Sequence, residues 1–229
     1  MSKPETDLAP RIREKTLDML LEKEPEEIST RDIAKACGVT ATSLYYYYKD
    51  KEALFTEIKL MCIEKMDATI SAQIARETAL QNARVTSLQN AKKIEKTRKQ
   101  GKKMEPLAEC RAGLEAFRDW AFANPRIALL VMGRLKADTQ ADPEKMKKYY
   151  QSTSFAKTVF DRMVQAGVLD SKDTLLDASL CIAALWGAIE MVLLNRTVPQ
   201  YWTKSGAVDF TDKMIDLLMT SLMSKNRQQ

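Results

Sequence analysis

The sequence contains no histidine among its 229 residues. Histidine is the base in Ser-His and Cys-His catalysis and the commonest transition-metal ligand in proteins. The sequence also lacks a nucleophile paired with another base, a glycine-rich phosphate loop and a cluster of metal ligands. These absences argue against an enzyme, so we expect no catalytic residues, no metal site and no cofactor.

Glycine and proline are scarce, at seven residues each. All-β and α/β folds need many tight turns, which use these two residues. Their scarcity favours long helices, and apolar residues recur with helical spacing along nearly the whole chain. We therefore expect an all-α protein with about nine helices, and its hydrophobic content of 45% is enough to form a core.

Long apolar runs and closely paired cysteines are also missing. No run approaches the roughly 18 residues that a membrane-spanning helix needs, and the N-terminus lacks the apolar core of a secretion signal. Cys37, Cys62, Cys110 and Cys181 form no CxxC pair, and a free cysteine in a helical context usually acts as a small buried hydrophobe. We expect a soluble cytoplasmic protein that does not associate with membranes.

The N-terminal region has no excess of positive charge, although the whole chain carries a net charge of +5. Residues 1–60 contain ten Lys and Arg against twelve Asp and Glu. A nucleic-acid site in this region must therefore depend on a few well-placed cations rather than on bulk charge.

Residues 29–48 have the start and stop signals of two short helices. Ser29 and Asp32 have the spacing of a capping box at the start of the first helix. Gly38 follows its end, where a left-handed residue is needed, and Thr40 can cap the second helix. Helix, short turn with glycine and helix together predict a helix-turn-helix, which places its second helix in the major groove of DNA.

Four consecutive tyrosines, residues 45–48, end the second helix and point in four directions about 100° apart. Leu44 and Tyr48 share a face and are the expected inward pair, which leaves the other three rings exposed. Exposed rings and nearby hydroxyls can contact phosphates or thymine methyl groups. The alternative is a capped helical hairpin without a DNA-binding role.

Two cations complete the predicted DNA-binding surface. Arg31 can reach a guanine, and Lys51 lies at a helix N-terminus, where its ammonium would reinforce a phosphate site. The residues that we expect to contact DNA are Thr30, Arg31, Thr40, Ala41, Thr42, Ser43, Tyr45, Tyr46, Tyr47 and Lys51.

Residues 10–62 resemble the DNA-binding domain of the TetR family of transcriptional regulators. The matching residues are Ile28, Ser29, Thr30, Ile33, Ala34, Ala36, Gly38, Val39, Leu44, Tyr45, Tyr47, Lys51, Leu54 and Phe55. Tyr48 stands where the family usually has Phe. The resemblance implies a homodimer on a palindromic operator and a C-terminal domain that binds a small molecule. It also implies that Thr30, Tyr45 and Lys51 contact phosphates or base methyl groups.

This resemblance suggests two domains. We expect a three-helix DNA-binding domain at residues 8–68 and a larger helical ligand-binding and dimerisation domain at residues 69–229. Residues 77–105 are predicted to be a charged helical insertion with a basic run at 92–103. That run is either a solvated connector or projecting arm, or a second contact with DNA or a partner.

The C-terminal domain offers a dimer interface and a pocket. The last two helices, near residues 173–196 and 207–224, can form a four-helix interface with a second copy. Glu190 lies in an apolar stretch and either anchors a ligand, pairs with Arg196 or a partner chain, or faces solvent. The candidate pocket residues, for which plain core is the alternative, are Phe117, Trp120, Met132, Phe155, Phe160, Met163, Trp186 and Glu190.

Together these features predict a ligand-responsive repressor that a small molecule releases from its operator. Repression relieved by ligand is the usual sense that the resemblance implies, but the sequence does not fix the sign of regulation, so an activator is an alternative. A helical protein-interaction module is a second alternative, and it would show no salt-dependent DNA binding.

Overall fold

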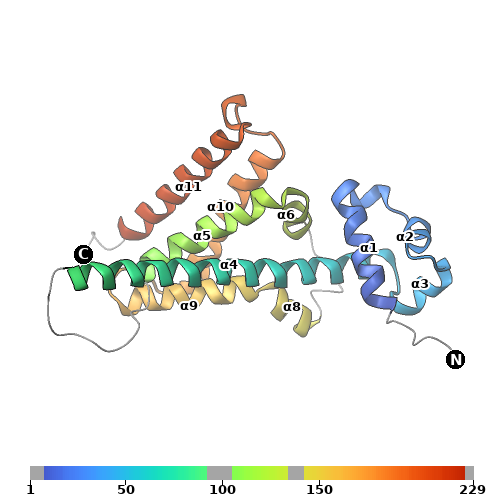
Figure 1. Ribbon diagram of the computed structural model, residues 1–229, viewed down its shortest axis with the longest axis horizontal. Helices are drawn as coiled ribbons and strands as arrows, with labels where there is room; N and C mark the ends of the chain where they lie inside the picture. The colour runs from blue at the N-terminus through green and yellow to red at the C-terminus, as the bar shows by residue number, and fades with distance from the viewer. Residues whose placement is uncertain (1–7, 92–104, 134–141, 225–229) are drawn as a thin grey trace. The chain divides into compact units, whose positions relative to one another are not determined.

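The computed structural model describes residues 8–91, 105–133 and 142–224. These residues form ten α-helices and two short 3-10 helices, with no β-strand among them (Figure 1). The predicted all-α class is confirmed, and the number of helices is close to the expected nine. The basic run at 92–103, predicted as a connector or a second contact, lies outside the described residues.

The chain divides into two compact units. The first contains Met1–Lys65 and Asn124–Tyr149, and the second contains Met66–Ala123 and Tyr150–Gln229. Helix α4 (Lys51–Ala91) contributes residues to both units. The first unit therefore includes a segment that follows its N-terminal part by about 60 residues along the chain.

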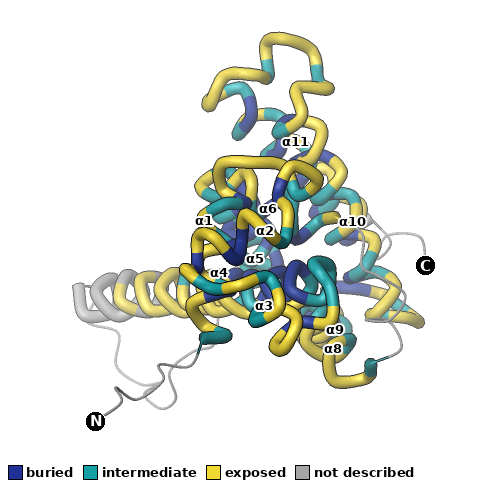
Figure 2. The backbone as a smooth tube through the Cα atoms, turned by 90° about the vertical axis from the view of Figure 1, so that its right-hand side faces the viewer, coloured by how far each residue is buried: buried dark blue, intermediate teal, exposed yellow. Residues whose placement is uncertain are grey.

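The first unit is built around α1 (Leu8–Glu22), α2 (Thr30–Ala36), α3 (Ala41–Tyr47) and the beginning of α4. A 3-10 turn, η1 (Pro25–Glu27), joins α1 to α2. Each helix turns one apolar stripe inward, and Figure 2 shows the resulting alternation of buried and exposed positions. The large apolar side chains that are fully buried in this core are Ile12, Ile28, Ile33, Leu44, Leu54 and Ile58.

Helices α6 (Pro125–Met132) and α8 (Pro143–Tyr149) complete the first unit. Helix α6 packs against α1 and buries Ala128 and Val131. Proline at the first position of both helices suits the start of a helix, where no intrahelical donor is lost.

Lys59 of α4 is a buried cation in this unit. Its side chain is only 5% exposed, and its ammonium donates a hydrogen bond to the carbonyl of Gly133, directly after α6. Burial lowers the pKa of Lys59 to about 8, because a charged ammonium loses hydration in a buried position. The α6 carbonyl end compensates in part, since a helix C-terminus favours a cation.

The second unit contains α5 (Pro106–Ala123), α9 (Gln151–Gln165), α10 (Thr174–Leu193) and α11 (Lys204–Ser224). Helix α10 packs against the other three, and α5 packs against α9 and α11. A 3-10 turn, η2 (Pro199–Tyr201), joins α10 to α11. The core of these helices includes Leu114, Phe117, Val159, Phe160, Met163, Leu185, Ile189 and Ile215.

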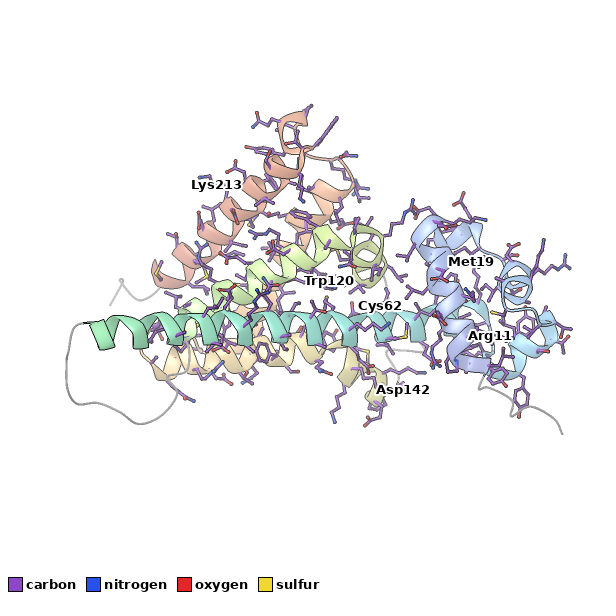
Figure 3. The ribbon with its side chains drawn as sticks, viewed as in Figure 1. Arg11, Met19, Cys62, Trp120, Asp142 and Lys213 are labelled. Carbon is purple, nitrogen blue, oxygen red and sulfur yellow. The ribbon has the colours of Figure 1, made fainter. Side chains whose placement is uncertain are left out.

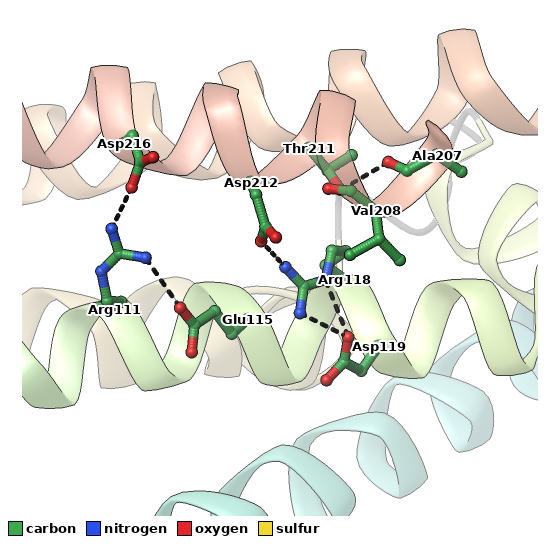
Figure 4. A network of polar contacts seen from close by, with 9 residues as sticks. All are labelled: Arg111, Glu115, Arg118, Asp119, Ala207, Val208, Thr211, Asp212 and Asp216. Atoms are coloured by element: carbon green, nitrogen blue, oxygen red, sulfur yellow. Dashed lines mark hydrogen bonds and ion pairs between the residues drawn. The ribbon is translucent and has the colours of Figure 1, made fainter. Parts of the chain in front are cut away.

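Two arginines of α5 hold α11 by ion pairs (Figure 4). Arg111 pairs with Asp216, and Arg118 pairs with Asp212 and with its neighbour Asp119. The Arg118 side chain is only 9% exposed, against 40% for Arg111. The Arg118–Asp212 pair therefore stabilises the contact between α5 and α11 more than the Arg111–Asp216 pair does, because an exposed pair is strongly screened by water. Lys213 lies on the side of α11 that points away from α5 (Figure 3).

Among the described helices, α10 alone is long and apolar enough to pass a composition test for a membrane span, with a mean hydropathy of 1.7. Its packing against α5, α9 and α11 accounts for the buried third of its apolar window. A core helix of a folded domain has this composition as well, so the test is weak support for a span. The exposed remainder of α10 is relevant to assembly, as argued below.

We predict that the free energy of unfolding rises with pH between about 8 and about 10.5 because of Lys59. The folded chain releases this proton near pH 8, whereas the unfolded chain keeps it until about pH 10.5. The unfolded state thus binds more protons in this window, and stability increases with pH. Below about pH 8 the whole cost of burying the charge, about 3 kcal/mol, is present.

Urea unfolding followed by circular dichroism across this pH range measures the effect. The control is Lys59→Met, which removes the titrating group and keeps much of the side-chain volume. The unfolding free energy of the wild type minus that of Lys59→Met should increase by about 3 kcal/mol from pH 8 to pH 10.5. A difference that stays constant would contradict the assignment.

Candidate nucleic-acid interface

Helix α2 begins with the predicted capping box. The Ser29 hydroxyl accepts a hydrogen bond from the Asp32 amide at 3.2 Å, and the Asp32 carboxylate accepts one from the Ser29 amide at 3.0 Å. Hydrogen bonds from Ser29 lower the pKa of Asp32. Ile28 and Ile33 on either side of this cap are fully buried, which fixes the direction in which the chain enters α2.

The turn between α2 and α3 also has the predicted form. Gly38 has a φ of 64°, in the left-handed region that favours glycine. The amides of Gly38 and Val39 donate to the carbonyls of Lys35 and Ala34, which closes the end of α2. The Thr40 hydroxyl then accepts a hydrogen bond from the Ser43 amide at 3.2 Å and caps α3. Sequence and structure agree at every step of this motif.

The four tyrosines divide as predicted between core and surface. Leu44 is fully buried and Tyr48 is 5% exposed, so these two form the inward face. Tyr45, Tyr46 and Tyr47 are 50%, 86% and 38% exposed. The rings of Tyr46 and Tyr47 meet edge to face with centroids 5.3 Å apart, which restricts both rings. Helix α3 therefore presents aromatic rings to solvent in a defined arrangement.

Hydroxyl groups around α3 bond to one another. The hydroxyls of Thr40 and Ser43 lie 2.9 Å apart, and those of Thr30 and Tyr45 lie 3.4 Å apart. These contacts orient each side chain before any ligand arrives. A hydroxyl has one donor and two acceptor sites, so each group can still bond to a phosphate or a base edge.

Lys51 has a structural partner that the sequence did not indicate. Its ammonium donates to the carbonyls of Pro25 and Ile28, at 3.0 and 3.1 Å, and lies 5.3 Å from the centre of the Phe55 ring. Lys51 thus ties the turn before α2 to the start of α4. An ammonium has three donors, so one N–H is left for a phosphate.

Two arginines of α1 also position the motif. Arg11 donates to the carbonyl of Cys37 at the end of α2, at 2.7 Å. Arg13 donates to the Tyr48 hydroxyl at 3.3 Å and pairs with Glu57 at 2.7 Å. Sequence reasoning missed both roles, because their partners lie 26 to 44 residues further along the chain and no local pattern marks them.

Three of the predicted pocket residues come together in the second unit. The Phe117 ring stacks with the rings of Trp120 and Trp186, with centroids 6.3 and 6.0 Å apart. Trp120 lies on α5 (Figure 3) and Trp186 on α10, so the cluster joins two helices. Both tryptophans are half-buried, while Phe117 is buried.

The other predicted pocket residues are dispersed. Phe160 and Met163 are buried in the α9 core, whereas Phe155 of the same helix is 42% exposed. Met132 lies on α6, in the first unit. Glu190 is exposed on α10, in agreement with the solvent-facing or partner-facing alternatives for this carboxylate.

All four cysteines are buried and none forms a disulfide, as the sequence suggested. Burial raises the pKa of the Cys110 thiol to about 12, which disfavours the reactive thiolate. In the described parts of the chain, no three His, Cys, Asp or Glu residues gather as a metal site would require.

The fold and this site define a helix-turn-helix, DNA-binding transcriptional regulator. The family described as bacterial regulatory proteins, tetR family, matches residues 12–58, which cover α1 to the start of α4. The helix-turn-helix domain of this chain is therefore similar in sequence to the DNA-binding domain of the tetR family.

Solved structures share this fold over nearly the whole chain. A Rhodococcus sp. RHA1 protein of unknown function is 13% identical with a TM-score of 0.69, covering 97% of this chain and 100% of its own. A putative tetR-family regulator from Shewanella sp. PV-4 is 15% identical with a TM-score of 0.62, covering 94% and 97%. The fatty acid degradation regulator FadR from Bacillus halodurans is 13% identical with a TM-score of 0.60, covering 95% and 97%. No curated protein matches at a significant level.

We predict that Lys51→Met destabilises the first unit as well as weakening DNA binding. The variant loses two hydrogen bonds from a charged donor and leaves two carbonyls without that partner, at a cost of about 1.5–3 kcal/mol. Urea unfolding measures the loss, and Lys35→Met, at an exposed position of α2, is the control. Equal stability of the two variants would show that the Lys51 anchor contributes nothing.

Proposed function

We propose that this protein is a ligand-responsive repressor that binds a palindromic operator as a homodimer in the cytoplasm. The observation that carries the proposal is the surface of α3, where three exposed tyrosines stand on a helix capped at its start and anchored from its inner face. Exposed aromatic rings are costly to solubility unless they have a partner, and a DNA groove is the partner that a helix-turn-helix serves.

In this proposal α3 enters the major groove and α2 flanks it. The hydroxyls of Thr30 and Tyr45 and the third N–H of Lys51 bond to phosphates. Arg31 is exposed on α2 and can reach a base edge or the backbone. The remaining members of the surface line the groove side, namely Thr40, Ala41, Thr42, Ser43, Tyr46 and Tyr47.

The homodimer would form through α10 and α11. Leu176 and Leu180 of α10 are 54% and 58% exposed, and Leu217 of α11 is 66% exposed. These leucines lie on two helices that already pack against each other, so their apolar surfaces can be covered together. A two-fold axis would pair each helix with its copy in a four-helix interface.

Regulation would follow from a shift between two conformations. Two recognition helices must lie about 34–36 Å apart to enter successive major grooves. A ligand that binds more tightly to a state with another spacing lowers DNA affinity. The cluster of Phe117, Trp120 and Trp186 favours an apolar or aromatic effector, because ligand pockets are lined mainly by such side chains. If the ligand instead strengthens DNA binding, the regulator would act in the opposite sense, as an activator.

We predict that Thr42→Glu abolishes operator binding. Thr42 is exposed on α3, and a carboxylate there would face the DNA phosphates and bases. Operators are first selected from random duplexes, and affinity is then measured by fluorescence anisotropy. The matched control is Ser71→Glu, which adds the same charge at an exposed position of α4. Wild-type affinity in the Thr42 variant would place DNA on another surface, and failure to select any duplex would favour a protein-interaction module.

We predict that Leu180→Glu converts the dimer to a monomer and weakens operator binding by at least about a hundredfold, since one half-site then binds alone. Sedimentation velocity measures the mass, and circular dichroism checks the helix content. Leu80→Glu, at a 48% exposed leucine of α4, is the control and should remain dimeric. A dimeric Leu180 variant would exclude α10 from the interface.

A further inference from the structure

Helix α3 lacks the side chains that usually read bases in the major groove. Its sequence, ATSLYYY, contains no charged residue and no Asn or Gln. Arginine and lysine are the common readers of guanine, and asparagine and glutamine are the common readers of adenine. Base selection by this helix must therefore depend on hydroxyls, on methyl groups or on aromatic rings.

Four of the hydroxyls near α3 are already engaged with one another. Thr40 caps the helix and lies against Ser43, and the Tyr45 hydroxyl lies against Thr30. Among the tyrosines of α3, Tyr46 is by far the most exposed, at 86%, and its ring is held edge to face by Tyr47. The most prominent feature of the groove-facing helix is thus an oriented aromatic ring.

An aromatic ring in the major groove has one apolar partner on the base edges. That partner is the 5-methyl group of thymine, because the other groups there are hydrogen-bond donors and acceptors. Ala41 and Thr42 are small, so they do not hold the helix away from the bases. Tyr46 can therefore reach the floor of the groove without a competing long side chain on the first turn.

We propose that Tyr46 determines operator specificity by packing its ring against a thymine methyl group in each half-site. This inference rests on the proposed DNA-binding function and adds the chemistry of base selection to it. The ring, and not the hydroxyl, makes the selective contact. Phosphate bonds from the hydroxyl would position the helix without selecting a base.

The expected size of the effect follows from the burial of one methyl group. A buried methyl or methylene contributes about 0.8 kcal/mol, which is about a fourfold change in affinity for one half-site. A dimer on two half-sites should therefore lose about fifteenfold when both methyl groups are removed.

The experiment uses the full-length dimer and a duplex selected from a random pool. Each thymine of the selected consensus is replaced in turn by deoxyuridine, in both half-sites together, so that only the methyl group is lost. One position should show the fifteenfold loss with the wild type and with Tyr46→Phe. With Tyr46→Ala, binding should be weaker and the same replacement should have no further effect. Low ionic strength keeps the weaker variant measurable.

Other outcomes overturn the inference. If deoxyuridine at every position leaves the affinity of the wild type unchanged, the protein does not recognise a thymine methyl group. If Tyr46→Ala still loses about fifteenfold in affinity on the deoxyuridine replacement, another side chain contacts the methyl group. A Tyr46→Phe variant as weak as Tyr46→Ala shows that the hydroxyl, through a phosphate or a base, makes the contact. Absence of any consensus from the random pool is a different result, because it removes the proposed DNA-binding function itself.

Discussion

Everything proposed for this protein depends on how one seven-residue helix is held against the rest of its domain. Helix α3 buries one side chain completely, Leu44, and the following Tyr48 almost completely. A helix with so little buried surface would not be stable alone. Its position is set from both ends, by the Thr40 cap and by the Arg13 bond to the Tyr48 hydroxyl. The exposed face can therefore be given over to recognition.

The distribution of cations explains why net charge is a poor guide to the proposed DNA-binding surface. Arg11, Arg13 and Lys51 all donate hydrogen bonds inside the first unit. Their charge fixes the geometry of the helix-turn-helix, and α3, the helix proposed to enter the groove, is itself uncharged. In the proposed arrangement, affinity would come from shape and a few phosphate contacts, so the first sixty residues would need no excess of positive charge.

The sequence predicted the parts of the structure that depend on near neighbours. The caps at Ser29 and Thr40 and the turn at Gly38 each involve residues within a few positions, and helical spacing alone divided the tyrosines. It did not predict contacts between distant segments, such as Lys59 with the Gly133 carbonyl 74 residues later. The sequence also did not predict that α6 belongs to the first unit, because α6 packs against α1, a helix that is distant along the chain. Helical periodicity identifies an apolar stripe but not the segment that covers it. The sequence therefore could not show that Phe155 is exposed while Phe160 and Met163 are buried.

The four buried thiols, none of which is in a disulfide, are distributed two to each unit. Cys37 and Cys62 lie in the first, and Cys110 and Cys181 in the second. A reagent that modifies thiols can reach them only when the surrounding helices separate, so the rate of modification at each position reports how often its own unit opens. The chain thus contains native reporters of local opening, and mass spectrometry could compare the two units in a single sample without any added label.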